Sequence, residues 1–462
     1  MQNRAFHIFI PRLCLIFLLA FFILNLIPAD AQALPLFAKK YRLPCKACHE
    51  AFPKLNDFGN LFRMNGYQLK TGNDVISADS GLSLIAMRTT VTGSVGSQSA
   101  VPTDVSNSDT VTTGTFSMTS LDMLSAGVLA EDLSYLAVIT PFFGNQVDLE
   151  SVFVRFSNVF NSPWFNIKVG KHELELPASA HRALGLTSGY LPYSYHPGGS
   201  ANINQFDFGA NKFGIELLGH SPEGRVNYAL DIHNGSDDAN KHPNLYGRLA
   251  FQQDHNLSSQ KLGFFFNYGV SPLASKTIGG TPIPGTGENN QRFMRAGSDL
   301  TFNFGTSGAP SASLSFQYHY GVDAGALVGP TTLPDTAITC PVPPCATPYT
   351  NSSTGIVSTG GTQDGIFSGG VIELNLMPSL NTVIFGHYDR VNTSQQPDPA
   401  LPSDYNNQTG VTIGTRYYYY QTSQMLMAFH LEYSSLTVSK ANLVTLEDLV
   451  TQTVLAGIDF AF

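Results

Sequence analysis

The chain contains 462 residues, of which 13% are charged and 43% are apolar, and its net charge is −9. Low charge together with 32 Phe and 19 Tyr excludes an intrinsically disordered chain, which has few aromatic residues and high charge. The acidic balance excludes a general nucleic-acid binder. Only one long apolar run occurs, close to the N-terminus, and this argues against a helical membrane protein. We therefore expect a large, Gly-rich and mainly β protein.

Residues 1–33 have the pattern of a secretory signal peptide. Arg4 and Arg12 form a basic start, an apolar stretch covers 13–27, and Ala31-Gln32-Ala33 supplies a cleavage site. The alternative is an uncleaved anchor helix, but the position of the Ala-x-Ala site favours cleavage. We expect the mature chain to begin after this site and to work in an oxidising compartment.

A Cys-Lys-Ala-Cys-His sequence over residues 45–49 is the attachment motif of a c-type haem. Cys45 and Cys48 are spaced to reach the two vinyl groups on one edge of a porphyrin. His49 then presents its imidazole to the iron as the proximal ligand. A redox dithiol, half a zinc site and a structural disulfide are the other interpretations. No βαβ pattern or second Cys/His pair lies nearby in sequence, so we predict one c-type haem.

A short helix is predicted after this motif, because Pro53 suits the first helical position and Gly66 suits the position after the last turn. Four apolar side chains recur there at helical spacing, and we expect them to pack on the haem or on the wall of a larger surrounding structure. They are Phe52, Leu55, Phe58 and Phe62.

The sixth ligand of the haem iron has three candidate sources. Met64 is the nearest in sequence, although on a continuous helix it lies off the apolar stripe. The other two are a His or Met elsewhere in the chain, and water or an open position.

The residues around the motif form a basic head, which we assign to residues 34–72. Between residues 34 and 70 there are seven basic and two acidic residues, a net charge of +5, whereas the chain from residue 71 onward carries −15. Opposite charge predicts that the head docks onto the rest of the chain. A segment this short lies below the roughly 40 residues that a lone domain needs, so a surrounding wall is expected.

Residues 73–462 show the period-two alternation of transmembrane strands, apolar on one face and polar on the other. Clear examples lie over 311–320, 425–434 and 262–268. We predict an antiparallel β-barrel of about 16 strands, with short turns at the periplasmic end, longer loops outside and the haem segment lodged within. The strands are expected to start near residues 82, 115, 133, 147, 163, 205, 224, 243, 259, 290, 310, 366, 380, 408, 424 and 452. The alternative is a soluble periplasmic protein of two packed sheets, which the many Phe and Tyr on the alternating faces disfavour.

Several connections are predicted to be long extracellular loops, among them those around Thr103 and Tyr190. The longest covers 321–365 and is rich in Thr, Pro, Gly and Ser. It contains Cys340 and Cys345, for which a local disulfide is the simplest interpretation and a metal site the less favoured one.

The head resembles the fused outer-membrane monohaem cytochrome–porin proteins that are associated with iron-oxidising bacteria. Three stretches carry the resemblance: Leu-Pro-Leu-Phe-Ala-Lys-Lys-Tyr over 34–41, the haem motif over 45–49, and Pro-x-Leu-Asn-x-x-Gly-x-x-Phe-Arg-x-Asn-Gly-Tyr over 53–67. A weaker echo lies over 170–182. The resemblance implies one haem held within the barrel by Cys45, Cys48 and His49. It implies no fixed role for Met64 and does not extend to the Cys340–Cys345 loop.

The resemblance implies a conduit in the bacterial outer membrane that takes electrons from extracellular Fe(II), or another redox partner, and passes them to a periplasmic carrier. With Fe(II) as the substrate, the protein would be an oxidoreductase. One haem inside a protein-lined pore would shorten electron transfer across a hydrocarbon layer of about 30 Å. The alternatives are a solute porin plugged by its haem head and a conduit that delivers electrons outward. We also expect the protein to contact outer-membrane lipid, and we expect no nucleic-acid partner.

Overall fold

The computed structural model of the chain describes the head and most of the region that follows it. The described residues are 37, 40–41, 43–70, 74–76, 85–104, 107–143, 146–187, 189–197, 204, 206–235, 242–272, 277–278, 281–282, 290–306, 309–328, 348–350, 357–359, 362–393, 406–421, 425–439 and 447–461. The predicted signal peptide and the Cys340–Cys345 pair lie outside these ranges. Within them, no helix is long and apolar enough to cross a membrane.

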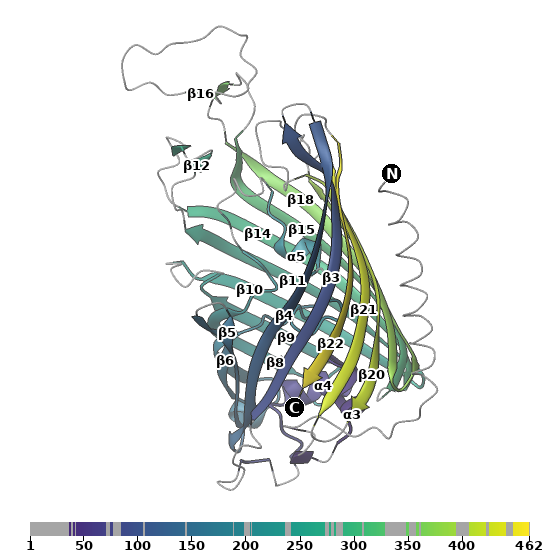
Figure 1. Ribbon diagram of the computed structural model, residues 1–462. Helices are drawn as coiled ribbons and strands as arrows, with labels where there is room; N and C mark the ends of the chain where they lie inside the picture. The colour runs from purple at the N-terminus through teal and green to yellow at the C-terminus, as the bar shows by residue number, and fades with distance from the viewer. Residues whose placement is uncertain are drawn as a thin grey trace.

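Sixteen antiparallel strands form one closed barrel, which confirms the predicted strand number and fold class (Figure 1). The ring closes where the last strand pairs with the first, with Phe460 opposite Thr89. The strands are β3 (Ile85–Asp104), β4 (Asn107–Ala130), β5 (Leu133–Phe143), β6 (Gln146–Phe156), β7 (Asn166–His172), β8 (Lys212–His220), β9 (Val226–His233), β10 (Asn244–His255), β11 (Ser258–Pro272), β14 (Asn290–Thr306), β15 (Ala309–Val328), β18 (Thr362–Ser379), β19 (Thr382–Thr393), β20 (Gln408–Gln421), β21 (Leu426–Val438) and β22 (Leu449–Ala461). Two small hairpins, β12 (Thr277–Ile278) with β13 (Thr281–Pro282) and β16 (Pro348–Thr350) with β17 (Val357–Thr359), lie apart from this ring.

The predicted alternation places apolar side chains on the outside of the barrel. On β11, Phe264 and Phe266 are 49% and 41% exposed. Phe265 and Asn267 alternate with them along the strand, face inward and are buried. A continuous apolar outer face on a closed barrel leaves no strand edge and suits a lipid environment. The chain is thus an integral barrel of the bacterial outer membrane.

The connection expected to be long near Thr103 is short. Strands β3 and β4 continue to Asp104 and Asn107, so two residues separate them, and β4 begins eight positions before the predicted start near 115. The two strands stay paired up to the turn that joins them, for example at Val101 opposite Asp109. Because a membrane strand needs only about 9–11 residues, two strands this long reach beyond the bilayer.

The segment between β7 and β8, expected as an outer loop around Tyr190, folds into the barrel instead. Its short helix α5 (Leu191–Ser194) lies among the strands in Figure 1. The hydroxyl groups of Tyr190 and Tyr193 donate to Glu373 (2.6 Å) and Gln317 (3.0 Å) on the inner wall. The polar inner face of the barrel supplies these partners, so the segment can bury its aromatic rings while its hydroxyl groups stay hydrogen-bonded.

Candidate functional site

The head lies inside one end of the barrel, near the end of β22 (Figure 1). It consists of α3 (Cys45–Cys48), β1 (His49–Ala51), β2 (Lys54–Leu55) and α4 (Asp57–Met64). The prediction that a helix starts at Pro53 is wrong, because residues 52–53 form the turn between β1 and β2. The helix begins after Asn56, whose side chain accepts from the Gly59 amide at 2.8 Å and so caps it. Gly66 follows the helix with a φ of 68°, in agreement with the prediction.

The two cysteines and the histidine of the motif face one cavity between the head and the barrel wall. Cys45 and Cys48 form no disulfide among the described residues, and together with His49 they line a cavity of about 350 Å³. Its apolar lining includes Phe52, Leu55, Phe62, Leu136, Val138 and Phe153. The size and apolar lining of this cavity, at a Cys-x-x-Cys-His motif, suit a flat hydrophobic cofactor.

Helix α4 approaches α3 closely because residue 59 is glycine. A Cβ atom added there would lie 2.0 Å from the Cys48 carbonyl oxygen, well inside contact distance. The side chain of Asn56 ties the same two elements together by donating to the carbonyls of Lys46 and Ala47 at 3.0 and 3.1 Å. The cysteine-bearing turn is therefore held rigidly against the helix.

The His49 ring is oriented by the backbone of the head. Its Nδ1 lies 3.1 Å from the Pro53 carbonyl oxygen, which can only accept, so Nδ1 carries a proton. Burial lowers the pKa of His49 to about 4, and the ring is neutral at pH 7 with Nε2 available as a ligand. Burial, with Cys45 nearby, raises the pKa of Cys48 to about 11, so this thiol is protonated at pH 7.

Two of the predicted residues are not brought to this cavity. Phe58 is 38% exposed and does not line it, unlike the other three members of the apolar stripe. Met64 lies beside a separate small cavity with His220 and Tyr228. It is two positions past Phe62 on α4, and a rotation of about 100° per residue turns it to the other side of the helix.

His181 lines the cavity and was given no role from the sequence. It belongs to the segment that folds inward between β7 and β8. Its Nδ1 lies 3.0 Å from Glu150 Oε1, while its Nε2 is buried without a hydrogen-bond partner among the described residues. Met87 and His172 also line the cavity, but His172 Nε2 is 2.6 Å from Asp231. The echo over 170–182 was the one sequence signal for His181.

Ion pairs attach the basic head to the acidic wall, as the charge distribution predicts. Arg63 forms two hydrogen bonds of 2.6 Å with Glu175, and Lys54 lies 2.6 Å from Glu373 on β18. Although burial acts against the charge, Glu175 raises the pKa of Arg63 and Glu373 raises that of Lys54. Both cations therefore stay charged in the docked head.

Comparison with solved structures finds outer-membrane porins and channels at low sequence identity. No protein-family model and no curated protein sequence matches the chain. The anion-selective porin from Comamonas acidovorans is 12% identical, with a TM-score of 0.48, over 82% of this chain and 99% of the porin. The channel DcaP of Acinetobacter baumannii is 9% identical, with a TM-score of 0.46, over 82% and 97%. A loop L8 deletion mutant of OmpT from Vibrio cholerae is 9% identical, with a TM-score of 0.44, over 82% and 99%. The barrel assignment itself rests on the closed strand pairing of this chain.

Proposed function

We propose that the chain is an outer-membrane electron conduit that holds one c-type haem through Cys45 and Cys48, with His49 as the proximal ligand. It takes electrons from extracellular Fe(II) and passes them to a periplasmic carrier. The observation that carries the proposal is the convergence of two cysteine thiols and one oriented imidazole on a single, largely apolar cavity between the head and the barrel wall. When bound, the haem would accept and release one electron at a time.

The residues around the cavity fit this cofactor. The proton on His49 Nδ1 leaves Nε2 as the ligand atom, which is the arrangement of metal-bound histidines. Apolar side chains make up much of the cavity lining. Arg88 and Arg182 also line the cavity and would supply guanidinium donors for the two propionates, Arg182 in addition to its ion pair with Glu173. Neither cysteine forms a disulfide among the described residues, which fits covalent attachment of the cofactor at both thiols.

His181 is our candidate for the distal ligand, because its Nε2 is buried at the cavity without a partner among the described residues. We expect the ferric wild-type protein to be low-spin and His181→Ala to become high-spin, since an axial position opens. Electron paramagnetic resonance of the detergent-purified protein measures this change. His181→Met should restore the low-spin signal.

His220→Ala is the matched control, because His220 is a buried histidine away from this cavity and its loss should leave the spin state unchanged. A low-spin signal that survives in His181→Ala would contradict the assignment and point to Met87 or His172.

Vesicles with a soluble c-type cytochrome sealed inside test the conduit. Fe(II) added outside should reduce the internal cytochrome when the holoprotein is in the membrane. The Cys45→Ser, Cys48→Ser double variant is the matched control, because it keeps the pore and loses the haem. Equal rates with both proteins would mean that Fe(II) itself passes the pore, and the conduit proposal would then fail.

The barrel fold also favours a second candidate, a solute porin whose head is a plug. A large single-channel conductance of the holoprotein in planar bilayers would support that function instead. In the same vesicles, a reductant sealed inside could instead reduce an acceptor added outside. If this reaction occurs and the inward reduction by Fe(II) does not, electrons flow outward.

A further inference from the structure

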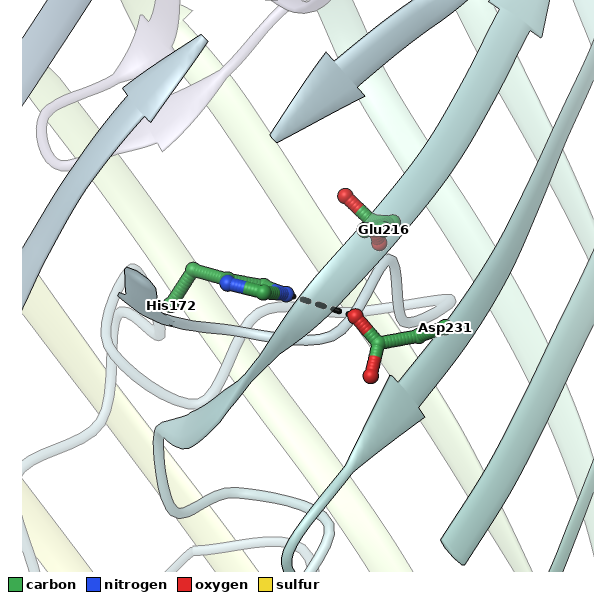
Figure 2. A group of neighbouring side chains, drawn as sticks. All are labelled: His172, Glu216 and Asp231. Carbon is green, nitrogen blue, oxygen red and sulfur yellow. Dashed lines mark hydrogen bonds and ion pairs between the residues drawn. The ribbon is translucent and has the colours of Figure 1, made fainter. Parts of the chain in front are cut away.

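We propose a binding site for one divalent transition-metal ion formed by His172, Glu216 and Asp231. Three neighbouring strands, β7, β8 and β9, each contribute one of these side chains (Figure 2). Glu216 and Asp231 are direct partners in the β8–β9 register, and one ligand atom from each of the three residues lies within 4.8 Å of the others. All three side chains are fully buried.

The histidine is in the tautomer that binds metal. His172 Nδ1 lies 3.0 Å from the Gly170 carbonyl oxygen, which can only accept, so Nδ1 carries a proton. In a neutral ring Nε2 is then a bare acceptor, yet it faces Asp231 Oδ2 at 2.6 Å. Two acceptors this close need a cation between them, either a proton or a metal ion. Metal-bound histidines characteristically donate their other N–H to a carbonyl or carboxylate.

The carboxylates lack full compensation within the described part of the chain. Glu216 forms an ion pair with Lys168, which also lies 3.4 Å from Glu175 and so serves two acidic groups. Asp231 Oδ1 and Glu216 Oε1 are buried without a hydrogen-bond partner among the described residues. Burying an unpaired acceptor is costly, and two carboxylates directly opposite on neighbouring strands repel each other. A bound cation relieves both costs.

The donor set selects the class of ion. One imidazole nitrogen with two carboxylates suits Fe(II), Mn(II) or Zn(II), whereas Ca²⁺ and Mg²⁺ prefer oxygen ligands alone. Metal–ligand bonds of about 2.0–2.2 Å place ligand atoms roughly 3–4.4 Å apart. The three ligand atoms, which lie within 4.8 Å of one another, are near this range, and His172 Nε2 and Asp231 Oδ2 at 2.6 Å need to separate slightly. His172 also lines the candidate haem cavity, which puts the ion beside it. We assign Fe(II), the substrate, as the natural occupant of the site, and this assignment rests on the proposed function. The existence of a metal site does not depend on that function.

Titration with Mn(II) tests the site without relying on redox activity. Free Mn(II) is followed by electron paramagnetic resonance as it is added to the detergent-purified full-length holoprotein. We expect one tight site per chain in the wild type and at least a tenfold weaker site in His172→Gln and Asp231→Asn. Zn(II) should displace the bound Mn(II) from the wild type, a result that needs no variant.

His387→Gln is the matched control. His387 is also a buried strand histidine next to a carboxylate, Asp389 at 3.0 Å, but it belongs to no three-residue ligand group among the described residues. Its Mn(II) binding should equal that of the wild type.

Two outcomes would overturn the site. Absence of tight Mn(II) binding in the wild type would mean that a proton bridges His172 and Asp231. Unchanged binding in both site variants would place the ion elsewhere. The reduction of the haem by Fe(II), measured on the same samples, is a separate readout. If the protein shows no metal binding at this site but Fe(II) still reduces its haem, the proposed function stands and only the metal site is rejected.

Discussion

Purified Cys45→Ser, Cys48→Ser protein should contain no covalently bound haem, whereas the wild type should retain one haem per chain after denaturation. On the proposed function, thioether bonds would form only at these two thiols, which line the same cavity. Haem staining on denaturing gels and the pyridine haemochrome spectrum measure the loss. Each single variant should keep a bound haem at lower yield, through the remaining thioether and the His49 ligand.

Serine is close to cysteine in size, so the double variant should keep the barrel, as checked by far-ultraviolet circular dichroism and heat-modifiable gel mobility. Met64→Leu is the matched control, because Met64 lies at a different cavity and its loss should leave both haem content and spectrum unchanged. Wild-type protein from a host able to mature cytochromes c that lacked covalent haem would overturn the cofactor assignment.

Glu175→Gln should loosen the head inside the barrel by about 3–5 kcal/mol, the cost of removing one partner from a buried ion pair. Glu175 accepts two hydrogen bonds from Arg63 and lies 3.4 Å from Lys168, so its loss leaves two largely buried cations close together. The exchange rate of the α4 amide protons in deuterated buffer measures the effect. An increase of roughly 10²- to 4 × 10³-fold is expected.

Glu223→Gln is the control for this variant, because its ion pair with Arg225 is exposed on both sides and contributes little. Its α4 exchange should match that of the wild type. Equal exchange in Glu175→Gln and Glu223→Gln would show that packing, rather than the Arg63 ion pair, holds the head.

The same ion pair predicts how docking depends on pH. Burial alone would raise the pKa of Glu175, but Arg63, Lys168 and Arg155 together hold it well below the ordinary value of 4.5. A lowered carboxyl pKa contributes stability that is fully present above the unfolded-state value and is lost as the pH falls through the folded-state value. Slow α4 exchange should therefore persist from neutral pH to below the ordinary carboxyl pKa of 4.5 in the wild type.

Much of the barrel can be predicted from the sequence because strand periodicity is local. Each strand alternates within its own ten or so residues, so the count of 16 and the inward and outward faces follow without knowledge of the neighbours. Strand ends are less certain. The alternation near Thr103 weakens, and the observed continuation of β3 and β4 depends on their pairing with each other.

The head shows the same division. The motif identifies Cys45, Cys48 and His49 because the chemistry needs those residue types at that spacing. The helix start was misplaced, since Pro53 satisfies the local rule for a first helical position while Asn56 takes the capping role through contacts with the preceding helix. Met64 is a candidate ligand because it is near the motif in sequence, but nearness does not decide which side of α4 meets the cavity.

Local spacing and period thus determined the strand number, the lipid-facing side chains and the candidate haem-attachment residues, since each depends on neighbours within a few positions. The tertiary structure decided which connection turns inward, which histidine reaches the cavity and that His172, Glu216 and Asp231 meet. Those outcomes depend on pairing and packing between segments far apart in the chain, and no local pattern records which distant side chain will become a neighbour.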